Sequence, residues 1–250
     1  MDMLNIRVPH IVVSGALLLA SVFSAGSAQG AELSGNLKRA DIREILKVIG
    51  WGTNHRGFAA HGMTNQGLGL DIGFEAPFFL RHEIDSLGDG RGIMPRVFPV
   101  PRLWLAWDFP EEFSLSASIS PGNLYDSITT FGLGGQWVFL RDERVTVSAT
   151  FSYTYANAFN GDLTSHTPGL MVQVSKDLEV WQPFAAFGFV SANGSVDKDL
   201  TASGTDAGPY TAPATHLALG FRLDLMAQIV FQLDLIGTRP SAGMLFSHRF

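Results

Sequence analysis

The sequence has no cysteine, few charges and no long apolar segment after residue 31. Without cysteine the chain has no disulfide framework, no thiolate metal site and no lipid-modified cysteine. Charged residues make up only 16%, against 46% hydrophobic residues and a mean hydropathy of +0.17, which is high for a soluble protein. The net charge of −6 argues against nucleic-acid binding, which needs basic patches. Beyond residue 31 no apolar run reaches the ~18 residues of a membrane-spanning helix.

Residues 1–30 have the organisation of a secretory signal peptide. Arg7 supplies the positive start, residues 11–23 form the apolar core, and small residues follow, with cleavage expected after Ala28 or Gly30. An apolar core of about 13 residues is too short to span a bilayer of ~30 Å. An exported, apolar chain without a spanning helix is either a secreted β protein or an outer-membrane barrel.

The last part of the chain alternates large apolar residues with small or polar ones, as a strand with two different faces does. The residues of the face expected to point outward are Leu217, Leu219, Phe221, Leu223 and Leu225, then Ile229, Phe231, Leu233 and Leu235, then Ala242, Met244, Phe246, His248 and Phe250. A chain that stops on an aromatic residue resembles the terminal strand of Gram-negative outer-membrane barrels. The resemblance implies that Phe250 is an assembly signal.

Seven earlier segments alternate in the same way, which brings the expected number of strands to ten. They lie at residues 67–75, 96–109, 113–119, 131–139, 145–155, 170–174 and 181–189. Pro99 and Pro101 lack the N–H that a ladder needs, so the upper part of the second segment is expected to be irregular. The sequence therefore predicts an all-β fold, a closed antiparallel transmembrane β-barrel of about 10 strands over residues 67–250.

Connector lengths and aromatic residues support a barrel over a secreted sandwich. Short connectors (110–112, 141–143, 176–179, 226–228) alternate without exception with longer ones (77–95, 120–126, 157–165, 193–211, 237–241), as short periplasmic turns and external loops do. Outward aromatic residues gather at the two ends, as interfacial girdles do. At the short-turn end these are Trp107, Phe109, Phe113, Trp137, Phe139, Trp181 and Phe250, and at the other Tyr153, Tyr155 and Tyr210.

Residues 31–66 are expected to form a short amphipathic helix and a linker. The helix is predicted from Asn36 to Ile49, with an apolar face of Ile42, Ile45, Leu46 and Ile49, and Gly50 is expected to stop it. A plug in the barrel lumen should be polar on most sides, whereas this helix has an apolar stripe. The stripe favours docking at the rim or membrane surface over a lumen plug, with a mobile linker as a third interpretation.

Two short stretches resemble a known family. Gly67–Glu75 is similar to the first strand of uncharacterised proteins near the long-chain fatty-acid transporters, and so are residues 174–178 followed by 182–184. The resemblance implies a porin-like or transporter-like outer-membrane barrel with a small, possibly hydrophobic, cargo. Members of that family have more strands and a larger N-terminal hatch.

Signatures of barrel enzymes are missing from the sequence. No histidine is followed two residues later by serine, as in outer-membrane phospholipases and lipid A deacylases, and no Asp-x-His occurs. His82, Glu83, Asp85 and Asp89 could bind a divalent cation, but loop acids are more commonly just hydrated. The expectation is therefore a protein that is not an enzyme and has no metal or cofactor.

The charges expected to face the lumen are the candidate functional residues: Asp71, Glu75, Arg102, Asp108, Arg222, Asp224, Asp234 and Arg249. In a narrow barrel they must pair or stay wet. A salt-bridged closed interior is the structural interpretation. The functional one is a gated channel in which Arg222 and Arg249 bridge Asp108, Asp224 and Asp71.

The expected function is a narrow channel or small-molecule transporter in the bacterial outer membrane. The alternative is a structural or surface-interaction barrel with a closed lumen, acting through its external loops. The expected partners are outer-membrane lipid and lipopolysaccharide and the barrel-assembly machinery, with no nucleic acid.

Overall fold

The fold is taken from a computed structural model, which describes residues 32–56, 69–80, 86–90, 97–110, 112–120, 128–142, 144–178, 180–225 and 227–250. The predicted signal peptide lies outside these residues, as do His82, Glu83, Asp85 and the part of the predicted linker at 57–68. None of the helices in the described ranges has the length and apolar character needed to cross a membrane.

One helix, two short 3₁₀ turns and a single large sheet make up the described chain. The helix is α2 (Arg39–Gly52), and the 3₁₀ turns are η2 (Phe159–Gly161) and η3 (Lys198–Leu200). The strands are β1 (Gly69–Leu80), β2 (Val97–Pro99), β3 (Arg102–Phe109), β4 (Phe113–Ser120), β5 (Ile128–Arg141), β6 (Val145–Ala158), β7 (Leu163–Lys176), β8 (Trp181–Val196), β9 (Tyr210–Asp224), β10 (Gln228–Ile236) and β11 (Arg239–Arg249).

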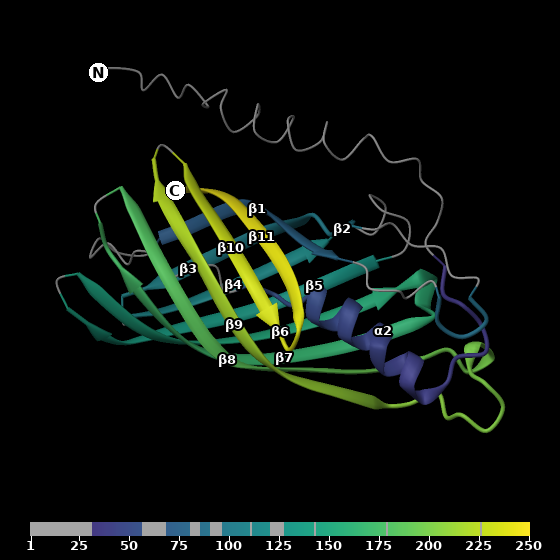
Figure 1. The fold of residues 1–250 in the computed structure, drawn as a ribbon. Helices are drawn as coiled ribbons and strands as arrows, with labels where there is room; N and C mark the ends of the chain where they lie inside the picture. The colour runs from purple at the N-terminus through teal and green to yellow at the C-terminus, as the bar shows by residue number, and fades with distance from the viewer. Residues whose placement is uncertain are drawn as a thin grey trace, which may run out of the picture.

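The sheet is a closed, ten-stranded antiparallel barrel, as the sequence predicted (Figure 1). Neighbours in sequence pair around the wall, and β11 pairs with β1 from Asp71↔Arg249 to Phe79↔Ser241 to close it. β2 and β3 share one place beside β1 in one register, with Phe78↔Pro99 followed by Glu75↔Arg102. They are one strand interrupted at residues 100–101, where the prolines were expected to disturb the ladder.

Side chains alternate between an apolar outer surface and the lumen. Within β3, Leu103, Leu105 and Trp107 are exposed, whereas Arg102, Trp104, Ala106 and Asp108 are buried. The described surface displays leucine, valine, phenylalanine and tryptophan on almost every strand. The period-two pattern therefore sets which side chains face outward, because a slip of one residue would turn every lumen carboxylate outward.

The two ends of the barrel differ in their connectors. Residues 110–112, 142–144, 177–180 and 225–227 join strands at what we call the short-turn end. Residues 81–96, 121–127, 159–162, 197–209 and 237–238 join them at the long-loop end. The expected strict alternation is wrong for two hairpins, since 159–162 and 237–238 are as tight as the short turns. β6, β7 and β11 run further than expected because their ladders continue past the last large outward apolar residues.

The aromatic girdle also needs one correction. Trp107, Trp137 and Trp181 are exposed on the outer surface, as expected. Tyr210 is buried instead, with its hydroxyl donating to the Asp206 carbonyl (2.5 Å) and the Arg39 guanidinium over its ring. Because Leu217 faces outward, the period of two turns Tyr210 into the lumen.

The prediction of a helix docked at the rim is wrong: α2 fills the lumen at the long-loop end. Figure 1 shows α2 inside the barrel. It packs mainly against β8 and also against β9, β7, β1 and β6, and its four predicted apolar residues are fully buried. The apolar stripe of α2 fits inside the barrel because this half of the lumen is itself apolar. Its wall presents Phe79, Ile128, Ala156, Ala158, Leu163, Val190, Ala192, Val196, Ala212 and Ile236.

The helix boundaries also differ from those expected, Asn36 to Ile49. Gly50 does not stop the helix but lets it approach the wall, because a Cβ there would lie 2.5 Å from the Ala192 Cβ. The helix ends at Gly52 and is capped by Thr53, whose hydroxyl donates to the Ile49 carbonyl (2.7 Å). A glycine at a close contact and a helix-ending glycine cannot be told apart by position alone.

Candidate functional site

The candidate site lies where the apolar half of the lumen gives way to a polar half. Residues 53–56, which we call the tip, follow α2 and are all buried. The lumen wall toward the short-turn end carries polar residues: Ser114, Gln136, Ser148, Thr150, Gln173, Ser175, Gln182, Gln228 and Ser247. The tip therefore reaches the polar region while α2 remains in the apolar one.

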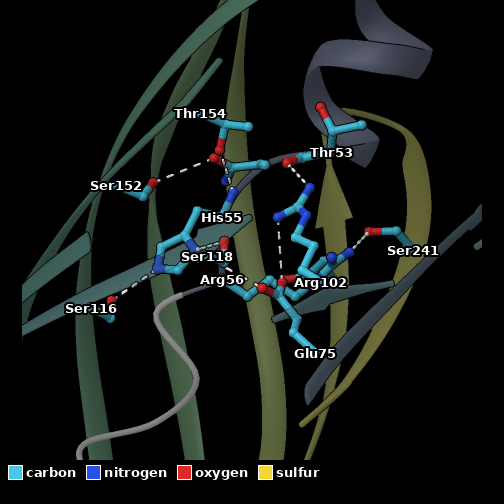
Figure 2. A network of polar contacts seen from close by, with 12 residues as sticks. Thr53, His55, Arg56, Glu75, Arg102, Ser116, Ser118, Ser152, Thr154 and Ser241 are labelled. Atoms are coloured by element: carbon cyan, nitrogen blue, oxygen red, sulfur yellow. Dashed lines mark hydrogen bonds and ion pairs between the residues drawn. The ribbon is translucent and has the colours of Figure 1, made fainter. Parts of the chain in front are cut away.

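His55 is held by the β4 wall. Its imidazole Nδ1 lies 2.9 Å from the Ser118 hydroxyl and Nε2 lies 2.8 Å from the Ser116 hydroxyl (Figure 2). Its backbone N–H donates to the Thr154 hydroxyl on β6 at 2.6 Å. Glycines opposite make room for the ring, since a Cβ on Gly134 would come within 2.8 Å of Nε2.

Arg56 joins the tip to the opposite side of the lumen. Its Nε donates to the Asp234 carboxylate at 2.6 Å and its Nη2 to the Ser241 hydroxyl at 2.9 Å. Asp234 also accepts from Gln232 (2.7 Å) and lies 2.8 Å from Nε2 of His216. Arg56 and Asp234 are both almost completely buried, so each neutralises a charge that would otherwise be costly.

Arg102 and Glu75 complete this level of the lumen. The Arg102 guanidinium donates to the Thr53 carbonyl at the end of α2, and its Nη1 lies 3.5 Å from the Glu75 carboxylate (Figure 2). A cation at a helix C-terminus is favourable because the last carbonyls are partly negative. Arg102 therefore binds the end of the helix and also balances the charge of the Glu75 carboxylate in the wall.

A second group of charges lies nearer the short-turn end. Arg249 donates to the Asp71 carboxylate (2.8 and 3.1 Å) and also to Asp108. Arg222 donates to Asp224 at 2.7 Å, two residues along its own strand. The structure thus brings Asp71, Asp108 and Arg249 together and places Arg222 beside Asp224.

The eight candidate charges form two groups, and the five that were expected to form a gate make up the second group. Glu75, Arg102 and Asp234 hold the tip, and the other five stand below it. The sequence analysis missed the tip itself and His216. One signal could have found Arg56. Among the wall residues at the level of the tip, the two carboxylates of Glu75 and Asp234 face one guanidinium, that of Arg102, so a further cation was needed to balance the charge.

No group of three or more histidine, aspartate or glutamate residues in the described ranges is arranged to hold a metal ion.

At the long-loop end, burial and then the carboxylates of Asp197 and Glu32 raise the pKa of Asp162.

Comparison with known proteins gives a likeness of fold. No protein-family model and no curated protein matches the chain. Among solved structures, the chain is similar to Ail, the attachment invasion locus protein of Yersinia pestis, at 10% identity and a TM-score of 0.39, over 74% of this chain and 99% of that one. It is also similar to the KdgM porin at 9% identity and a TM-score of 0.37, over 72% and 99%.

A third similar structure corrects one expectation. The outer membrane protease OmpT of Escherichia coli matches at 9% identity and a TM-score of 0.35, over 76% of this chain and 97% of that one. A protease is thus among the barrels that resemble this chain. The expectation that the protein is not an enzyme is withdrawn, since neither the barrel fold nor the missing motifs exclude catalysis.

Proposed function

We propose that the protein is an integral barrel of the bacterial outer membrane whose pore is sealed by its own N-terminal segment, and that it acts through the surface it displays. The observation that carries this proposal is the burial of α2 and the tip inside the lumen. The apolar outer face supports a membrane location, because a closed barrel satisfies its backbone hydrogen bonds without water. In this orientation the long-loop end faces outward and the short-turn end faces the periplasm.

The strength of the seal follows from what α2 buries. Ile42, Ile45, Leu46 and Ile49 are all at 0% exposure. At roughly 1.5–3 kcal/mol for each fully buried side chain, the four contribute on the order of 6–12 kcal/mol. This is comparable to the whole stability of an ordinary domain. Such a helix stays in place, and an open pore is not the resting state.

Planar-bilayer recordings test the seal. The full chain should be silent, because α2 and the tip occupy the lumen. A variant with Ile45→Asn and Ile49→Asn loses about half of the buried apolar face and should conduct through the polar wall. Val172→Ile, on the lipid face, serves as the control and should remain silent. Conductance by the unchanged chain would contradict the proposal.

A narrow channel or small-molecule transporter is the second candidate. One observation favours it: the tip is held by charges and hydroxyls, contacts that water could replace if residues 53–56 withdrew. If residues 53–56 withdrew while α2 stayed in place, the lumen would open only in part and would give small conductance steps. Transport of a hydrophobic cargo, which the resemblance to fatty-acid transporters implies, stays a prediction.

The expected partners follow from the location. The exposed leucine, phenylalanine and valine side chains suit the hydrocarbon of outer-membrane lipid, and the long-loop end would meet lipopolysaccharide. Insertion would need the barrel-assembly machinery, with Phe250 as its signal. Copurification of the chain with the outer-membrane fraction tests the location independently of conductance.

A further inference from the structure

The path of the N-terminal segment relative to the barrel is unusual. Leu37 donates its N–H to the Leu200 carbonyl and accepts from the Ala202 N–H, so it is paired with the 197–209 loop. The Gly35 carbonyl accepts from Asp89, in the 81–96 connector. Residues 33–37 are therefore fastened between two connectors of the long-loop end.

From there the chain runs into the lumen and toward the opposite end. α2 fills the apolar half, and the tip reaches Ser116 and Thr154 on the wall. The next strand begins at Gly69, which pairs with Asp108 and lies beside Arg249 at the short-turn end. The chain thus enters the barrel at one end and starts its first strand at the other.

This arrangement has a topological consequence. Strands of an outer-membrane barrel are inserted from the periplasmic side, where β1 begins. Residues 32–37 stand at the other end, so they must cross the membrane, and the passage open to them is the lumen that α2 now fills. We infer that the barrel carries its own N-terminal segment through its lumen and displays the residues ahead of Leu37 on the cell surface.

The lumen sets the size of what can cross. It is occupied by a single helix, and a helix with its side chains is about 10–12 Å wide. An extended chain or one helix fits this passage, whereas a folded domain does not. The inference therefore predicts display of added sequence that is unfolded during passage, and retention of sequence that folds beforehand. It rests on the orientation in the proposed function, and the experiment separates the two.

A short hydrophilic epitope inserted between Ala31 and Glu32 is the test. On intact cells an antibody should bind it as well as the same epitope placed between Ser203 and Gly204 in the 197–209 loop. The epitope placed in the 142–144 turn should react only after permeabilisation. Outer-membrane fractionation and heat-dependent gel mobility, measured for all three, establish that each barrel is inserted and folded.

The outcomes distinguish the inference from its premise. If the loop epitope is reached and the N-terminal one is not, the display of the N-terminal segment is overturned while the orientation stands. If only the 142–144 epitope is reached, the orientation itself is wrong and both proposals fall. Binding to the N-terminal and loop epitopes alone supports both.

The lumen route has its own test. A small domain that requires disulfides to fold, placed ahead of Glu32, would fold in the oxidising periplasm before passage. We expect it to stay inside, and we expect the same domain with its cysteines replaced by serine to be displayed. Equal display of both forms would overturn passage through the lumen.

Discussion

The Arg56 guanidinium and the Asp234 carboxylate meet at 2.6 Å inside the barrel, although 178 residues separate them in sequence. Arg56 belongs to the tip and Asp234 to the wall. The pair therefore ties the N-terminal segment to the barrel, and it completes the charge balance among the buried residues at that level. Two opposite buried charges stabilise each other, and removal of one leaves the other unpaired in an environment that solvates a charge poorly.

Asp234→Asn is expected to lower the free energy of unfolding by about 3–5 kcal/mol, because the buried Arg56 guanidinium would lose the carboxylate that its Nε contacts. Arg56→Met should cost less, since His216 and Gln232 still contact the carboxylate. The double variant should recover most of the loss. Urea unfolding in lipid vesicles measures all three.

Lys176 is exposed, so Lys176→Gln is the control for this double-mutant cycle and should change the free energy of unfolding little. Strictly additive losses in the double variant would show that the two side chains do not interact.

The two faces of the wall should respond differently to one cation. Leu219→Arg places a guanidinium on the lipid face, where a midplane arginine costs roughly 2–4 kcal/mol. Gln173→Arg places it in the polar part of the lumen, among hydroxyls and amides. We expect the first variant to lose folded, heat-modifiable protein and the second to retain it. Equal yields would mean that the assignment of faces is wrong.

Deletion of Phe250 should reduce insertion far more than stability. Its side chain is 72% exposed and contacts the ring of His248, so its removal exposes almost no core. Its resemblance to terminal assembly signals predicts a defect during insertion instead. Membrane yield in cells and unfolding of the purified barrel give the two readouts. A truncated chain with normal yield would contradict the role of Phe250.

The wall of the barrel could be predicted from sequence because period-two alternation is a strong local signal. The strands, their lipid-facing residues and the inward direction of Asp71, Glu75 and Asp234 all follow from it. The strand ends were less predictable. Around Asn157 and Thr164 the outward residues are polar, so the ladder continues without the contrast in hydropathy that marks a strand.

The plug could not be predicted in the same way, because it depends on which half of the lumen is apolar. An apolar helix face fits equally well against a membrane surface, a rim or an apolar wall. The deciding residues, such as Val190, Ala192 and Ala212, lie on the inner face near the ends of long strands. In the sequence they stand just before or just after residues 193–211, which were expected to form a loop, and outside the strand expected at 181–189.

Gly50 offers a test of how closely α2 approaches the wall. In an isolated helix, Gly→Ala would stabilise by about 1 kcal/mol through propensity alone. Here a Cβ at this position would lie 2.5 Å from the Ala192 Cβ and 2.9 Å from the Ser165 hydroxyl, closer than such atoms come. Overpacking of this kind costs roughly 1–3 kcal/mol. Gly50→Ala is therefore expected to lower the free energy of unfolding.

The paired variant Gly50→Ala with Ala192→Gly removes the opposing methyl group and should recover part of the loss. Ala40→Gly, at an exposed position in the first turn of the same helix, measures propensity without a wall contact and should cost no more than about 1 kcal/mol. The sign of the change in the free energy of unfolding for Gly50→Ala shows whether contact with the wall or helix propensity dominates. If Gly50→Ala alone raises stability, propensity outweighs contact, and α2 cannot lie against β8 as closely as the lumen plug requires.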